Sequence, residues 1–180
     1  MGTKQIWLIL SIFVLQSRSV PAQDQLVFPV PSGITDQLFY LQRTPNTNTV
    51  IYALNYKNGE LDSLKPVHVF WIRYPEQGQQ QELSAIQRKF AYGIESKWIG
   101  PDQYELHFLA YKKRVMLLKK SADNKYHVFT EVNKRQMIIS RIFLQINGGS
   151  LFKPNIEYVE FTGLDAATGL PVKERVSIQI

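Results

Sequence analysis

The chain has 180 residues, 21 lysines and arginines against 15 acidic residues, and no cysteine. The absence of cysteine excludes disulfides, thiolate metal ligands and cysteine nucleophiles. The formal net charge of +6 is modest, whereas nucleic-acid-binding proteins usually concentrate far more positive charge on one face, so we expect no nucleic-acid partner.

Residues 1–22 have the three parts of a secretory signal peptide. Lys4 carries a positive charge, Ile6 to Leu15 form an apolar run, and the small residues of Val20-Pro21-Ala22 suit the enzyme that removes such peptides. A membrane-spanning helix needs roughly 20 consecutive apolar residues, but this run ends at Gln16-Ser17-Arg18. We therefore predict cleavage near Ala22 and an exported protein, periplasmic or secreted, with no transmembrane segment after cleavage.

The rest of the chain is long enough for one domain with its own hydrophobic core. We expect residues 23–36 to form an extended N-terminal segment and residues 37–180 to form a single β-rich domain. No sequence repeat and no composition change divides this domain further.

The residue pattern predicts three strands in the first part of the domain. Strands 38–43 and 49–56 flank the turn-rich stretch 44–48, whose length fits a hairpin connection. Strand 67–74 is apolar on both faces, which predicts a central position in the sheet. Residues 75–82 are polar and predict a connection that interrupts the strands.

Residues 83–92 form the one predicted helix of the domain. Apolar side chains recur there with helical spacing at Leu83, Ile86 and Phe90. Ser84 and Gln87 have the spacing of a capping box at the start of a helix, and Gly93 stands where a helix typically stops.

Strands follow to the end of the chain, at 94–99, 103–111, 115–120, 125–132, 135–146, 155–161 and 172–180. Segment 135–146 has the length of a helix, but its residues sort onto the two faces of a strand, with Ile138, Ile142, Leu144 and Ile146 on one and Arg135, Arg141 and Gln145 on the other. Turn signals recur about every 8 to 12 residues. The sequence therefore predicts a mainly β fold, an antiparallel sandwich or barrel of about 8–10 strands with one short α-helix near residues 83–92.

The order of several segments resembles a known family. These segments are Phe39–Tyr52, Val69–Tyr74, Ile86–Gly93, Arg141–Gln145, Tyr158–Glu160 and Gly163–Glu174. Together they resemble the bacterial domain-of-unknown-function family numbered 4833, over nearly all of the chain that follows the signal peptide. The resemblance implies an exported bacterial protein, and it implies no activity and no site residues.

Three histidines in predicted strands, His68, His107 and His127, are weak candidates for metal ligands, together with Glu105 or Glu131. No local zinc-binding spacing such as His-Glu-x-x-His occurs, so a site would require three strands to bring the rings together. The alternative is that each histidine is half buried and bonded to its neighbours. We expect no bound metal and no cofactor.

Signatures of covalent catalysis are also weak. The chain has no Gly-x-Ser-x-Gly motif, and Gly148-Gly149 precedes no predicted helix that could hold a phosphate. Glycosidases use two carboxylates at a controlled separation, and Glu157 with Glu160 or Asp102 with Glu105 are pairs of this kind, although such pairs are common in proteins.

Two groups of residues are candidates for binding a ligand. The basic cluster could hold an anionic lipid headgroup or glycan, or it could be a solvated hairpin rim; its members are Lys112, Lys113, Arg114, Lys119 and Lys120. The aromatic group could line a pocket, or it could belong to the core; its members are Trp71, Trp98, Tyr104 and Tyr111.

These observations predict an exported, non-enzymatic β-domain protein. Its expected partner is an unidentified small ligand, an anionic envelope surface or another protein. The alternative is an exported hydrolase or metal-dependent enzyme, with a site around the strand histidines or the paired carboxylates.

Overall fold

The computed structural model describes residues 26–150 and 153–177. The predicted signal peptide, residues 1–22, lies outside the described residues, as do the last three residues of the predicted strand 172–180.

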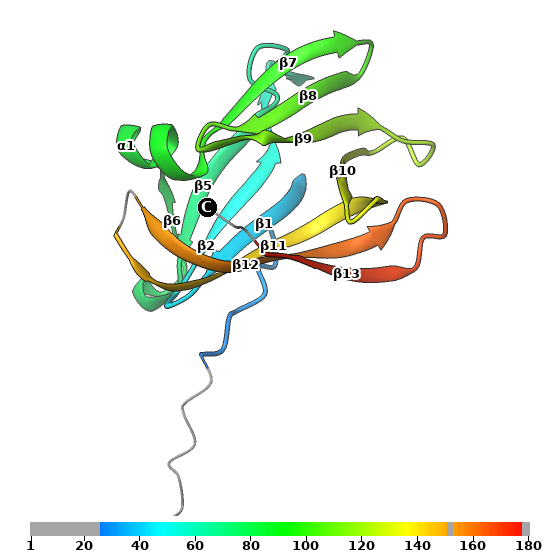
Figure 1. Cartoon of the computed structure of the whole chain (residues 1–180). Helices are drawn as coiled ribbons and strands as arrows, with labels where there is room; N and C mark the ends of the chain where they lie inside the picture. The colour runs from blue at the N-terminus through cyan, green and yellow to red at the C-terminus, as the bar shows by residue number, and fades with distance from the viewer. Residues whose placement is uncertain (1–25, 151–152, 178–180) are drawn as a thin grey trace, which may run out of the picture.

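A single large sheet forms the body of the protein and curls into a half-barrel (Figure 1). Its eleven strands are β1 (Gln37–Arg43), β2 (Asn46–Leu54), β5 (Val67–Arg73), β6 (Gln79–Glu82), β7 (Ile94–Gly100), β8 (Gln103–Phe108), β9 (Tyr111–Lys120), β10 (Tyr126–Val132), β11 (Arg135–Gly149), β12 (Pro154–Asp165) and β13 (Pro171–Val176). The order is β6-β5-β2-β1-β11-β10-β9-β8-β7, and β12 and β13 continue from β11. Two short strands, β3 (Tyr56–Lys57) and β4 (Glu60–Leu61), form a separate hairpin. The predicted mainly β fold is confirmed.

The predicted short helix is confirmed as α1 (Ala85–Gln87), which continues into the π-helical turn η2 (Arg88–Tyr92). A 3-10 turn, η1 (Tyr74–Glu76), precedes β6. Ser84 and Gln87 form the predicted capping box. The helix ends at Gly93, whose backbone is extended, and only glycine fits there because a Cβ atom would lie 2.0 Å from the Arg88 carbonyl oxygen. No helix in the described part is long and apolar enough to cross a membrane.

The sheet differs from the predicted antiparallel arrangement at one junction. Strands β1 and β11 run parallel, with Tyr40 opposite Arg141 and Arg43 opposite Leu144, while the other strand pairs described are antiparallel. This parallel pair joins an N-terminal group of strands to a C-terminal group. Local residue patterns carry no information about which distant strands pair, so the sequence did not reveal it.

Strand β6, which the residue pattern did not predict, lies inside the predicted polar connection 75–82. Its residues are exposed and pair with β5 at the edge of the sheet. An edge strand is held by main-chain hydrogen bonds and needs no apolar face, so polar composition did not exclude it. Strand β5 is therefore next to the edge and not central, although both of its faces are covered as predicted.

A bulge in β11 corrects one predicted face. Ile139 lies opposite Gly163, but Arg141 lies opposite Thr162, so β11 has one extra residue at Ser140. The extra residue reverses the alternation, and Ile138 therefore lies on the opposite face from the later apolar residues of the strand, such as Ile142.

The two faces of the sheet carry different cores. One cluster contains buried side chains from strands as far apart as β5, β9 and β12, which only the concave face can bring together. A smaller cluster contains Tyr40, Ile51, Ala53 and Phe70 and lies on the other, convex face, where Ile34 packs against it. The N-terminal segment covers more of that face, since Phe28 packs edge-on against Phe143 and the Pro29 carbonyl accepts a hydrogen bond from Gln42.

Candidate functional site

Buried polar atoms without partners gather at one place on the sheet. Within residues 26–150 and 153–177, four buried side-chain atoms have no hydrogen-bond partner: Arg43 Nε, Asn48 Oδ1, Trp71 Nε1 and Thr162 Oγ1. Three of the four lie on the adjacent strands β1, β2 and β5. Since native structures pair nearly all buried polar atoms, this concentration marks a candidate binding site.

The strand register places these three residues close together. Leu41, Val50 and Trp71 are direct neighbours across β1, β2 and β5, and all three are buried in the concave cluster. Arg43 and Asn48 each lie two residues from a member of this row, at the end of β1 and near the start of β2. The register shifts between Leu41 and Arg43, so Arg43 lies opposite Asn46. Arg43 hydrogen-bonds Tyr92, whose ring packs on Trp71, and these contacts place Arg43 beside Trp71 on the concave face. Asn48 lies two residues from Val50 on β2, on the strand between them.

Tyr92 from η2 completes the group. Its ring packs edge-on against Trp71, with 4.9 Å between ring centroids. Burial raises the pKa of Tyr92, and the charge of Arg43 together with a hydrogen bond from it acts in the opposite direction. The Tyr92 carbonyl accepts a hydrogen bond of 3.0 Å from the buried Tyr52 hydroxyl, which anchors the helix to the sheet. We call Arg43, Asn48, Trp71 and Tyr92 the interior polar cluster.

The chemistry of the interior polar cluster suits binding. Its buried unpaired atoms are two N–H donors and one carbonyl acceptor, and it also contains a hydroxyl and a permanent positive charge. None of its four side chains is a carboxylate, an imidazole or a thiol, so the cluster itself supplies neither a nucleophile nor a general base near neutral pH.

The predicted aromatic group does not come together. Trp71 belongs to the interior polar cluster, and Tyr104 is buried in the concave core. Trp98 and Tyr111 are exposed, with relative exposures of 61% and 42%.

The predicted basic cluster is divided between different contacts. Arg114 donates to the Glu131 carbonyl and stacks on Phe161 of the concave core. Lys119 covers the Phe129 ring, and Lys112 forms an ion pair with Glu95. Lys113 and Lys120 are exposed. Strand alternation separates neighbouring residues of β9, so the five side chains do not form one patch.

Each histidine has its own carboxylate partner. The Nε2 atoms of His68, His107 and His127 lie 2.6, 2.9 and 2.7 Å from Glu82, Glu105 and Asp123. In the described part of the chain, no group of three or more histidine or acidic side chains could hold a metal ion. The three-histidine metal site considered from the sequence is therefore not formed by these residues.

An open hollow of about 290 Å³ lies over β7, β8 and β9. Its lining residues are Glu95, Lys97, Glu105, His107 and Lys112. A hydrogen bond from Lys112, helped by its charge, holds the pKa of Glu95 below its ordinary value. His107 contacts the Glu105 carboxylate through Nε2 and the Lys112 carbonyl through Nδ1. Glu95 with Lys112 and Glu105 with His107 thus pair within the hollow, so we assign it no ligand.

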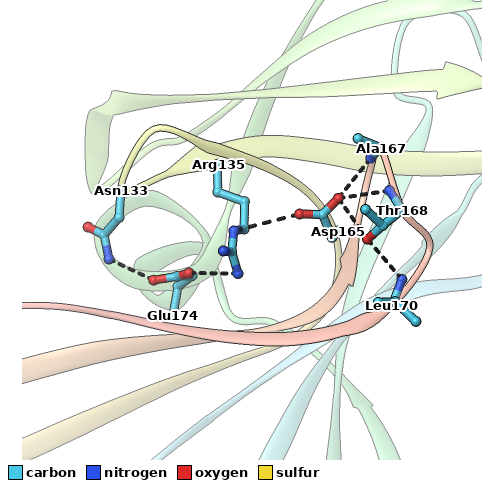
Figure 2. Close-up of polar contacts among 7 residues, drawn as sticks. All are labelled: Asn133, Arg135, Asp165, Ala167, Thr168, Leu170 and Glu174. Atoms are coloured by element: carbon cyan, nitrogen blue, oxygen red, sulfur yellow. Dashed lines mark hydrogen bonds and ion pairs between the residues drawn. The ribbon is translucent and has the colours of Figure 1, made fainter.

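A second polar group links two turns at the start of β11 (Figure 2). Arg135 lies between Asp165 and Glu174, at 3.6 and 3.3 Å, and Asn133 donates to Glu174 at 2.9 Å. Backbone N–H groups of Thr168 and Ala167 lower the pKa of Asp165. These contacts hold the β10–β11 turn against the β12–β13 turn, which is a structural role.

Glu160, one of the carboxylates considered above as a catalytic pair with Glu157, is buried among cations. Arg175, Lys173 and Arg141 lie 2.7, 3.5 and 3.8 Å from its carboxylate. Burial raises the pKa of Glu160, but the hydrogen bond from Arg175 and the charges of Lys173 and Arg175 outweigh burial and lower the pKa. A carboxyl that stays ionised is a poor general acid, so Glu160 acts as a structural counter-ion.

The sequence did not single out Arg43, Asn48 or Tyr92. Arg43 bordered the predicted turn 44–48 and Asn48 lay within it, whereas β2 already begins at Asn46. A signal was present, because Arg43 continues the inward-facing alternation of Phe39 and Leu41, where an apolar residue is expected.

Comparisons with known proteins give a family and no more. A family model described as a domain of unknown function, DUF4833, matches residues 39–175. A search of curated proteins and a search of solved structures each found no match. The match spans most of the chain and confirms the resemblance seen in the sequence. The chain therefore belongs to the DUF4833 family.

Proposed function

We propose that the protein is a non-catalytic binding protein that holds its ligand at the interior polar cluster. The observation that carries this proposal is Trp71 Nε1, a buried N–H donor without an acceptor, on a residue that is 7% exposed. A buried polar group without a partner costs about 1–3 kcal/mol. A ligand that accepts from Trp71 would remove this cost.

The position of the cluster supports the same proposal. Arg43, Asn48 and Trp71 come from three adjacent strands, and Tyr92 approaches them from the helix. Binding sites are typically apolar surfaces with a few convergent polar groups, and the cluster has this composition because Leu41 and Val50 lie within it. The export predicted from residues 1–22 is part of the proposal and assigns the ligand to the cell envelope or its surroundings.

Native mass spectrometry of the protein purified from its own host tests this function. We expect an adduct of defined mass that denaturation releases. Trp71→Phe should remove most of the adduct, and Trp98→Phe, a matched change at an exposed position, should retain it. Thermal melting of both variants checks that they are folded, and Arg43→Gln replaces Trp71→Phe if that variant does not fold. Absence of an adduct from the wild type, or an equal adduct in a folded Trp71→Phe or Arg43→Gln variant, would overturn the proposal.

A further inference from the structure

We infer that the ligand is an organic acid that carries an amide N–H beside its carboxylate and an apolar chain behind it. This inference rests on the proposed binding function and specifies the ligand of the same site. Three features of the concave face support it: an arginine without a counter-ion, an acceptor without a donor, and an apolar row that leads away from both.

Arg43 is the arginine whose charge and buried N–H group both lack a partner of opposite kind in the described part of the chain. Among the arginines in the described part, Arg73, Arg88, Arg135, Arg141 and Arg175 each lie within ion-pair distance of a carboxylate. Arg114 has no carboxylate but is occupied by the Glu131 carbonyl and the Phe161 ring. Arg43 has no carboxylate within ion-pair distance in the described part; it donates a hydrogen bond to the Tyr92 hydroxyl, and its Nε is buried without an acceptor. Because a guanidinium cannot lose its charge in a protein, an anionic ligand that accepts from the buried Nε would compensate both the charge and the unpaired donor.

The two free N–H groups fit one carboxylate. Arg43 Nε and Trp71 Nε1 are both donors that lack an acceptor, and a carboxylate offers two acceptor oxygens. Arg43 and Trp71 lie on either side of β2, on strands that are two spacings of ~4.8 Å apart. Long side chains span this separation, so one carboxylate placed over β2 can receive a hydrogen bond from each residue.

Asn48 adds a requirement for a donor. It lies on β2, between the strands of Arg43 and Trp71, and its Oδ1 is buried without a hydrogen-bond partner. A carboxylate alone cannot satisfy this oxygen, because it has no hydrogen to donate. An amide N–H next to the carboxylate would satisfy it, as in an acylated amino acid.

An apolar row continues from Arg43 across the concave face. Arg43 lies opposite Leu144, Leu144 opposite Val159, and Val159 opposite Val176. Leu144 and Val176 are only partly buried, so their side chains have apolar surface left to cover. The row spans three strand spacings, roughly 14 Å, which is close to the extended length of a lauroyl chain.

Isothermal titration calorimetry with matched ligands tests the inference. N-lauroylglycine has all three features, its methyl ester lacks the charge, laurate lacks the amide, and N-acetylglycine lacks the apolar chain. We expect the ester to bind roughly 10- to 100-fold more weakly than N-lauroylglycine, and laurate roughly 2- to 10-fold more weakly. N-acetylglycine should show no measurable binding. The tripeptide acetyl-Leu-Leu-Gly has the same acylated glycine end, but its apolar part is a peptide and not a fatty-acyl chain. Whichever of N-lauroylglycine and the tripeptide binds more tightly shows whether the apolar part of the ligand is acyl or peptide.

Variants test which residue causes each difference in affinity between these ligands. Arg43→Gln should abolish the preference for the acid over the ester, and Asn48→Ala should abolish the preference for N-lauroylglycine over laurate. Arg73→Gln is the control, because Arg73 lies on β5 but pairs with Glu76 and Gln81. Melting temperatures confirm that the variants are folded.

The two proposals fail in different ways. An ester that binds as tightly as the acid, or an acid-to-ester ratio that Arg43→Gln leaves unchanged, overturns the inference about the ligand. The same holds if the native adduct is present but no probe binds. The binding function survives these results, provided that the native adduct still depends on Trp71.

Discussion

Gly163→Ala should be among the most damaging single-methyl additions in this protein. Gly163 lies opposite Ile139, beside the bulge in β11. A Cβ atom at this position would lie 1.9 Å from the Ile138 carbonyl oxygen and 2.9 Å from its carbon. The closest usual carbon–oxygen contacts are about 3.3 Å, so the two backbones would have to separate by roughly 1.4 Å.

The expected cost follows from what has to move. Both contacting atoms at Ile138 belong to the main chain, so no side-chain rotation relieves the clash. Separating β11 from β12 weakens the hydrogen bonds around the bulge and loosens the packing of Phe161. Overpacking of a core costs typically 1–3 kcal/mol, and a clash between two backbones belongs at the upper end, so we expect a loss of about 3 kcal/mol.

Urea unfolding, followed by tryptophan fluorescence, measures this loss through the transition midpoint and slope. Gly100→Ala is the matched control, since no atom lies within 4 Å of the Cβ position and the backbone is not left-handed. We expect the control to stay within about 0.5 kcal/mol of the wild type. If Gly163→Ala is equally close to the wild type, the bulge does not hold β11 and β12 at a fixed separation.

Three further changes probe other contacts of the fold. Tyr52→Phe removes the hydroxyl bound to the Tyr92 carbonyl and should lower the free energy of unfolding by about 1–2 kcal/mol, measured in urea; an unchanged midpoint would show that the bond adds no stability. The pKa of Glu160 lies below its ordinary value, so its contribution is present above about pH 4.5 and is lost as the pH falls through the lowered pKa. Glu160→Gln should therefore lower the free energy of unfolding at pH 7, and the free energy of this variant should fall less than that of the wild type between about pH 5 and pH 3. The same dependence of unfolding free energy on pH in both proteins would contradict this. Gln42→Ala removes the hydrogen bond to the N-terminal segment and should speed proteolytic cleavage within residues 26–33, while an unchanged cleavage rate would mean that Phe28 holds the segment alone.

The sequence predicted the features of this fold that depend on neighbouring residues. Most strands, the short helix and its capping box at Ser84 follow from local periodicity and spacing, and the structure confirms them. The break between the predicted strands 125–132 and 135–146 is also confirmed: Asn133 and Lys134 lie in the turn between β10 and β11, and both have positive φ angles.

Features that depend on distant partners could not be predicted in this way. The parallel pairing of β1 with β11 leaves no trace in either strand alone, and the bulge at Ser140 reverses a pattern that looks regular in the sequence. Of the candidate site residues, only Trp71 was selected. Arg43 and Asn48 resembled residues of a hairpin turn, and their role depends on buried atoms that lack partners, which is a property of the packed structure.

The parallel pair also sets the order in which the protein can fold. Thr44, next to the end of β1, bonds through its hydroxyl to the main chain of Ile146, 102 positions later. Hairpins within each half can form early because their strands are close in sequence, but β1 must wait for β11, and closing so long a loop is slow. We therefore expect a nascent chain to keep one edge of its first hairpin unpaired until most of the protein has been synthesised. Refolding should be correspondingly slower than for a meander of the same length.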